Sequence, residues 1–521
     1  MMSPRNPPFD RRRLARSGGV GDFANAFPVR DREPRPRTAT ATTNRDRLPR
    51  PRAATAITAA LLCLALTPQI HTAELKAGAA MSVITPPIGT VLNGGVGPNV
   101  SRYVHDDLHA KALVLDDGTT RLCFLVADLC LLDRPFCDGA KVLIERETGL
   151  KAKDVMLSCT HTHSAGSATG GHLVDPDPEY RAWLPRRMVD AVKCAVANLE
   201  PAQLAFGRGS LPQHVFCRRL KLREGSTYVD QLGQTPVKAK MNWDSPHQDE
   251  IGPAGPVDPE VSFLSIQRAN GRPLALLGNY SLHYVGDVGP GHISADYFAA
   301  FAERIGELLH AEKQDPPFVG ILTNGTSGDI NNIDPQVKRQ PTPPYTRIRL
   351  VAGDLAREVH RGLKGLQHRG DVALAASLAE LKVATRRPSA EEVEKARAVV
   401  RGRPVSELSG WIENSAREQI ILSEYPAEVS IPLQGFRIGE VTVAGWPGEI
   451  FASSGLELKA RSPAKPLFNI GLANGWFGYI PPPEQHDLGA YETWRMRTSF
   501  LERDATVKML DRFVKLIEEL R

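Results

Sequence analysis

Apolar, β-branched runs alternate along the first half of the chain with segments of helical periodicity. Residues 111–117 and 121–129 predict two buried strands separated by Gly118. A helix is predicted over about 134–148, followed by a strand in DVMLSCTHTH and an amphipathic helix over about 180–199. This order of strand, helix and strand predicts a layered α/β fold, in which helices flank a mixed β-sheet core.

The second half of the chain continues the same alternation after a stretch rich in Pro, Gly and Asp. That stretch, about 225–259, predicts a long loop of the kind that shapes or covers a site. Further helices are predicted from about 295, after a proline-rich insert near 335–346, after PGE and at the C-terminus. Further strands are predicted at 261–267, 273–283, 318–324, 429–438, 441–446 and 467–475. With no internal repeat and no second strand set, one domain over 74–521 is the simpler interpretation.

The N-terminal region differs in composition from the rest of the chain. Residues 1–52 form an Arg- and Pro-rich leader with a local charge of +8, which leaves −3 elsewhere and argues against a nucleic-acid partner. The uncharged apolar run 53–67 is short for a membrane span, which needs about 20 residues. With its arginine-rich flank it predicts a signal-peptide-like segment over 53–73 and export to the periplasm or the extracellular space, although a core helix is the alternative.

Seven cysteines are present, and Cys63 lies in the segment that export would remove. The other six form no C-x-x-C pair and no zinc-finger spacing, and several lie in apolar runs. We expect buried thiols rather than disulfides.

Four predicted strand ends finish in polar residues that can bind a metal or polarise a carbonyl. They carry His161 and His163 in SCTHTHSAG, His283 in NYSLHYVG, Glu449 in AGWPGEIF and Tyr479 in GLANGWFGYI. Each has an ordinary explanation alone: a surface histidine pair, a structural histidine, a glutamate that starts a helix, and a buried tyrosine. Convergence of such ends is the usual construction of an active site, so we expect these residues to meet.

The ordered motifs resemble the catalytic domain of the neutral, or alkaline non-lysosomal, ceramidases. The resemblance covers most of the chain after the leader, through AGAAMSVITPPIGT, VHDDLHAKALVLDDG, SCTHTHSAG, PVDPEV, SLHYVGD, TSGDINN, WPGEIF and ANGWFGYI. It implies one zinc ion per chain, held by His161, His283, Glu449 and Tyr479. It also implies a proton-transfer or substrate-binding role for His163 and identifies Arg218 as the pocket arginine, with Arg219 as an adjacent ambiguity.

Two departures from the family pattern bear on the substrate. In GDINN the chain keeps Asp329 but has Asn331 where ceramide-active members carry a serine, and these two positions are the remaining candidates for catalysis. The chain also ends about 40 residues after Tyr479, so we expect it to lack the C-terminal β-sandwich domain of the characterised enzymes.

These observations predict an exported zinc amidohydrolase acting on ceramide or a related N-acyl lipid. Water activated by zinc would attack the amide carbonyl, Tyr479 and Arg218 would hold the developing oxyanion, and His163 would assist proton transfer. Peripheral contact with a membrane surface would suit a lipid substrate, and the oligomeric state is open. The alternatives are a zinc hydrolase of another amide or ester, and a non-catalytic binding protein on the same fold.

Overall fold

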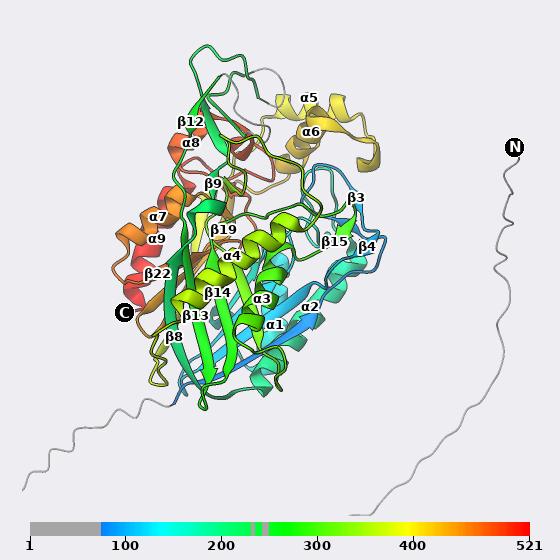
Figure 1. Cartoon of the computed structure of the whole chain (residues 1–521). Coiled ribbons are helices and arrows are strands. Elements are labelled where there is room, and N and C mark those ends of the chain that lie inside the picture. The colour runs from blue at the N-terminus through cyan, green and yellow to red at the C-terminus, as the bar shows by residue number, and fades with distance from the viewer. Residues whose placement is uncertain (1–73, 231–234, 242–248) are drawn as a thin grey trace, which may run out of the picture. The chain divides into compact units, whose positions relative to one another are not determined.

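The computed structural model of the chain describes residues 74–230, 235–241 and 249–521 (Figure 1). All of these residues belong to a single unit with its own core. The predicted leader, 1–52, and the signal-like segment, 53–73, lie outside the described residues. In the described part of the chain, no helix combines the length and the apolar character that a membrane span requires.

An eight-stranded mixed sheet forms the centre of the fold. Its order is β16-β14-β13-β8-β1-β5-β6-β7, with β6–β7 and β14–β16 parallel and the other neighbours antiparallel. The strands are β1 (Lys76–Val83), β5 (His109–Asp116), β6 (Arg121–Ala127), β7 (Val155–Cys159), β8 (Glu200–Ser210), β13 (Glu260–Arg268), β14 (Pro273–Tyr280) and β16 (Val319–Asn324).

Helices and a second sheet cover the two faces of the large sheet. In β5, Ala112 and Val114 pack toward α1 (Arg134–Thr148) and α2 (Pro178–Ala197), whereas Leu113 and Leu115 face the second sheet, because successive strand residues point to opposite faces. Phe124 meets Phe436 of the second sheet edge-on at 5.3 Å. The second sheet contains β18 (Leu374–Ala384), β19 (Glu428–Ile438), β20 (Val441–Gly445) and β22 (Leu467–Ile470), and α9 (Ala505–Glu519) packs against it. The predicted layered α/β fold with a mixed sheet is therefore confirmed.

The remaining elements are helices around these sheets and short strand pairs. The helices are α1 (Arg134–Thr148), α2 (Pro178–Ala197), α3 (Asp296–Leu308), α4 (Thr346–Gly362), α5 (Ala390–Val400), α6 (Gly410–Ser423), α7 (Ala452–Arg461), α8 (Pro483–Leu488) and α9 (Ala505–Glu519). The short strands are β2 (Val91–Leu92), β3 (Asn99–Val100), β4 (Tyr103–Val104), β9 (Phe216–Cys217), β10 (Arg219–Leu222), β11 (Ala239–Met241), β12 (Glu250–Pro253), β15 (His292–Ile293), β17 (Ile330–Asn331), β21 (Glu449–Ile450) and β23 (Tyr479–Ile480).

Helix α1 coincides with its predicted range because local residues set both of its ends. The Asp133 side chain accepts a hydrogen bond from the Phe136 amide, and Pro135 lies in the first turn, where its missing N–H costs nothing. Gly149 ends the helix at φ 76°, a left-handed conformation that glycine adopts without strain.

Other predictions are corrected by the structure. The expected long loop at 225–259 contains β11 and β12, which pair with β10 in a three-stranded sheet. Three strands of the structure, β1, β8 and β18, were not predicted from the sequence. All six described cysteines are free, as expected. Five of them are buried, but Cys194 is exposed on α2.

The segment after β22 joins the two margins of the large sheet and so creates the place where the polar strand ends meet. The Gly471 amide donates to the carbonyl of Asn324 in β16 at 2.9 Å, and the Asn474 amide donates to that of Leu157 in β7 at 2.6 Å. The large sheet therefore curves until β16 and β7, its outermost strands, lie on either side of this segment.

Candidate metal centre

Two histidines from opposite margins of the large sheet meet at their Nε2 atoms. His161 follows β7 in a left-handed conformation (φ 71°), which is uncommon for a residue with a side chain, and His283 follows β14. Their Nδ1 atoms lie 2.9 Å from the carbonyls of Cys130 and Ser327 respectively. Because a carbonyl can only accept, each Nδ1 donates, and each Nε2 is the ring atom that can bind a cation when it carries no proton. The two Nε2 atoms are 3.0 Å apart.

Glu449 adds a carboxylate oxygen to this pair. Its Oε2 lies 3.3 Å from His161 Nε2 and 3.6 Å from His283 Nε2. Its Oε1 accepts a hydrogen bond from Trp476 Nε1 at 2.9 Å, which fixes the carboxylate. Oε2 is buried and has no hydrogen-bond donor among the described residues. The three ligand atoms lie within 4.8 Å of one another, so these residues could hold a metal ion.

The ionisation of the three groups is coupled to cation binding. Burial, with the charges of His161 and Arg218, holds the pKa of His283 well below its ordinary value, so its ring is neutral. Burial alone would raise the pKa of Glu449, but His161 and Trp476 lower it, so the carboxylate is ionised. Although burial opposes its charge, Cys130 and Glu449 hold the pKa of His161 well above the ordinary value. The proton on His161 must leave when a cation binds.

Two close approaches of the backbone bring Glu449 beside Tyr479. The two residues are paired in the parallel ladder of β21 and β23, and the Glu449 amide donates to the Gly478 carbonyl at 2.9 Å. A side chain at Gly448 would lie 2.7 Å from that carbonyl, and one at Gly478 (φ 76°) would lie 2.6 Å from the backbone of Thr498. The glycines of PGE and GY are therefore needed for this pairing.

Tyr479 and His163 line one narrow cavity together with His161 and Glu449. Burial raises the pKa of Tyr479 well above its ordinary value, so the hydroxyl keeps its proton. His163 Nε2 lies 3.2 Å from His161 Nε2, and its ring stacks on Tyr284 at 3.7 Å. The structure thus brings together the four predicted ligands and His163.

The ambiguity between Arg218 and Arg219 is resolved by their contacts. Arg218 Nη1 lies 3.4 Å from His283 Nε2, and its guanidinium lies 5.3 Å from the ring centre of Tyr479. Arg219 points elsewhere and donates to Glu492, Gln485 and the Gly489 carbonyl. Arg218 is therefore the arginine at the candidate centre.

Glu492, which sequence reasoning missed, holds both arginines. Its fully buried carboxylate accepts from Arg218 Nε at 2.8 Å and from Arg219 Nη1 at 2.5 Å. Trp476 was also missed as the donor that orients Glu449. Nothing in the local sequence identifies either role, since their partners are distant in the chain, although Trp476 lies within the quoted motif ANGWFGYI.

Asp329 and Asn331 occupy different positions relative to the centre. Asp329 Oδ1 accepts from the Ala452 amide at the start of α7, and burial raises its pKa to about 6. It lines neither the cavity at His161 nor the one at His283. Asn331 lines the second of these, beside Arg218 and His283, because β17 pairs with β9. A catalytic role for either residue stays a prediction.

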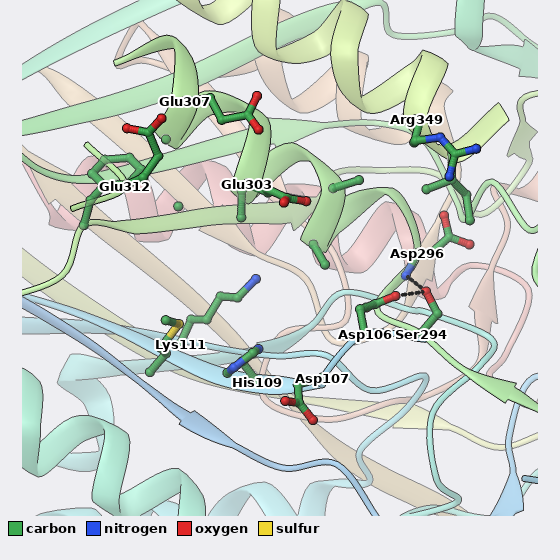
Figure 2. A pocket seen from close by; sticks show the side chains of 18 of the residues that line it. Asp106, Asp107, His109, Lys111, Ser294, Asp296, Glu303, Glu307, Glu312 and Arg349 are labelled. Carbon is green, nitrogen blue, oxygen red and sulfur yellow. Dashed lines mark hydrogen bonds between the residues drawn. The ribbon is translucent and has the colours of Figure 1, made fainter. Parts of the chain in front are cut away.

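Two other features of the described residues are alternative candidates for a functional site. Cys130, His161 and His163 form a second group that could hold a metal, sharing His161 with the first. A cavity of about 690 Å³ lies between β5 and α3 (Figure 2). None of the predicted site residues lines it, and its Asp106 carboxylate already accepts from the Ser294 hydroxyl at 2.6 Å and from the Ala295 amide at 2.7 Å. We therefore place the candidate centre at the histidines.

Comparison with known proteins supports the fold assignment. No protein-family model matches the chain, and no curated protein sequence matches it. Its structure is similar to that of neutral ceramidase from Pseudomonas aeruginosa, with a TM-score of 0.61, 17% identity, and coverage of 85% of this chain and 74% of that chain. It is also similar to a ceramidase complexed with C2, with a TM-score of 0.63, 16% identity, and coverage of 86% and 75%. The chain has a neutral-ceramidase-like fold, which confirms the resemblance that its motifs indicated.

Proposed function

We propose that the protein is a zinc-dependent hydrolase that cleaves the amide bond of ceramide or a related N-acyl lipid. The observation that carries the proposal is the meeting of His161 Nε2, His283 Nε2 and Glu449 Oε2, from three distant segments, at separations of 3.0, 3.3 and 3.6 Å. The neutral-ceramidase-like fold supports the same reaction class.

These separations fit a zinc ion. Ligand atoms about 2.1 Å from zinc at tetrahedral angles lie about 3.4 Å apart, which is close to the mean of the three distances. Two imidazoles and one carboxylate are also a ligand set typical of catalytic zinc. Oε2 of Glu449 has no hydrogen-bond donor among the described residues but lies 3.3 and 3.6 Å from the two histidine nitrogens, which a cation shared by the three atoms would explain.

When bound, zinc would supply a Lewis acid that acidifies a water molecule and polarises the amide carbonyl. The protein's own residues would transfer protons and stabilise the developing negative charge. Burial, with the charge of Arg218 nearby, holds the pKa of His163 well below the ordinary value, so its ring is neutral and can accept a proton from the attacking water. It can then return the proton to the leaving nitrogen. Tyr479 and Arg218 offer hydrogen-bond donors to the oxygen on which negative charge develops.

A zinc hydrolase of a different amide or ester is the second candidate. The observation that favours it is Asn331, which lines the cavity at His283 in the position where ceramide-active relatives carry serine. The same centre would serve both reactions, because zinc with donors at a developing oxyanion suits acyl transfer in general.

The test is hydrolysis of a fluorescent ceramide and a panel of shorter N-acyl amines by the full chain. We expect turnover that a chelator abolishes and added zinc restores. His161→Ala should lower turnover more than about 100-fold, since loss of an outer partner of a ligand alone costs about 10- to 100-fold. His360→Ala, at a partly exposed position of α4, is the matched control and should retain activity. Unchanged turnover in His161→Ala would overturn the proposal.

A further inference from the structure

A second cavity, of about 230 Å³, adjoins the candidate metal centre on the His283 side. Its lining includes Arg218, His283, Tyr284, Asn331, Asn332 and Arg339. Arg218 Nη1 is 3.4 Å from His283 Nε2, so any group bound here lies next to the scissile bond of a substrate held at the centre.

Three buried donors on residues that line this cavity have no acceptor among the described residues. They are Arg218 Nη2, Asn331 Nδ2 and Asn332 Nδ2, and each side chain belongs to a residue at most 8% exposed. Asn331 Oδ1 accepts from the Ile333 amide at 2.9 Å, which leaves Nδ2 as the free end of that amide. Buried polar groups are nearly always paired, so three unpaired donors on residues that line one cavity indicate an acceptor-rich ligand.

The charges at the cavity favour an anion as that ligand. Arg218 carries a guanidinium, which stays charged in proteins, and its Nε donates to Glu492 at 2.8 Å. Arg339 is exposed at the cavity, and in the described part of the chain it forms no ion pair. The one acidic residue of the lining, Asp287, already accepts from the Arg347 amide at 3.0 Å.

The cavity on the other side of the centre has a different character. It holds only about 30 Å³, and its lining mixes Leu131, Trp476 and Tyr491 with polar residues such as His172 and Thr498. That volume admits about one or two water molecules and neither an acyl chain nor a head group. Of the two cavities, the donor-rich one at His283 is therefore the one with room for a polar group of the substrate.

From this arrangement we propose that the substrate carries an oxyanion close to the scissile amide, and that its class is an N-acyl amino acid. The inference rests on the proposed amide hydrolysis. A carboxylate one carbon from the nitrogen would lie in the cavity whose lining residues carry the three unpaired donors, while the carbonyl lies at the metal centre. Hydrolysis would form a bond between the carbonyl carbon and water oxygen and break the C–N bond. The products are a fatty carboxylate and an amino acid, whose nitrogen keeps its hydrogen and gains both water protons.

The test compares three amides with one acyl chain: N-dodecanoylglycine, N-dodecanoylethanolamine and the phosphate ester of the latter. For the zinc-loaded full chain, kcat/KM should be about 10- to 100-fold higher for the glycine compound than for the neutral one, as expected for charge-assisted hydrogen bonds. The same preference should appear in calorimetric binding to the full chain stripped of metal with a chelator, which does not depend on turnover.

Variants connect the preference to the cavity. Arg339→Gln, at an exposed position that should not disturb folding, is expected to reduce the preference several-fold. Asn332→Asp, which places a carboxylate at the cavity, should abolish it while the neutral amide is affected less. Lys338→Gln removes the same charge from the neighbouring exposed residue, which does not line the cavity, and should leave the preference unchanged.

The outcomes separate this inference from the function on which it rests. If neutral amides are hydrolysed and bound as well as the glycine compound, the oxyanion site is refuted and the hydrolase stands. A preference for the phosphate ester overturns the assignment to amino acids. If none of the amides is hydrolysed but the metal-stripped protein binds the glycine compound preferentially, the oxyanion site is supported and the proposed hydrolysis fails.

Discussion

Glu449 and Tyr479 are paired residues in the parallel ladder of β21 and β23, so a candidate metal ligand and a buried phenol are held side by side by backbone hydrogen bonds. We expect Tyr479→Phe to lower kcat by about 100- to 1000-fold, the usual cost of losing one donor to a developing oxyanion. Zinc content should change little, because His161, His283 and Glu449 remain. Kinetics with metal analysis checks this, and Tyr425→Phe is the control, on a partly buried tyrosine that packs against Phe500. An unchanged kcat in Tyr479→Phe would exclude the phenol from the reaction.

Glu492 links the centre to the stability of the protein because it is the shared counter-charge of two buried arginines. Glu492→Gln should leave Arg218 and Arg219 without a buried anion and lower the free energy of unfolding by about 3–5 kcal/mol. Glu519→Gln, which breaks an ion pair with Arg512 on the surface of α9, should cost no more than about 1 kcal/mol. Urea denaturation of both variants makes the comparison. Equal and small effects would show that the arginines do not depend on Glu492.

The raised pKa of Asp329 predicts that the stability of the protein falls as pH rises. Burial raises its folded pKa to about 6, above the value near 3.9 expected in the unfolded chain. As pH rises between these values the unfolded chain ionises first, so stability falls until the folded pKa is passed. Asp329→Asn removes this effect while its side-chain oxygen can still accept from Ala452. Relative to the unmodified protein, the variant should gain about 1 kcal/mol between pH 5 and pH 7.5.

Denaturation of both proteins at these two pH values measures the difference directly. Asp511→Asn, an exposed carboxylate on α9, is the control and should show no such gain. A difference between Asp329→Asn and the unmodified protein that does not change with pH would contradict the raised pKa.

Local signals made much of the fold predictable. The buried runs that form β5 and β6 are apolar along their length, and α1 carries its own capping residues, so both follow from nearby sequence. By contrast, β8 contains small and polar residues with two glycines. It forms a strand because it pairs with β13 along its length and with β1 over two residues. A strand that depends on distant partners leaves little trace in its own residues.

Local sequence also made the candidate metal ligands predictable. It did not identify the residues that hold the arginine at the centre in place. His161, His283 and Glu449 stand in polar motifs that follow apolar runs, which marks them in the sequence. The choice between Arg218 and Arg219 depends on which face of a short strand meets the centre. Glu492 is an unremarked acid whose partner Arg219 lies 273 residues earlier in the chain. Such pairings become visible only when the chain is folded.

The coordination of zinc by the loaded full chain, measured by X-ray absorption, tests the central claim most directly. The account predicts nitrogen and oxygen ligands at about 2.0–2.2 Å, including two imidazoles, with one zinc per chain that is lost in Glu449→Ala. A sulfur ligand at about 2.3 Å would place the ion with Cys130, His161 and His163 instead and would contradict the account. Zinc content that stays unchanged in Glu449→Ala would contradict it equally.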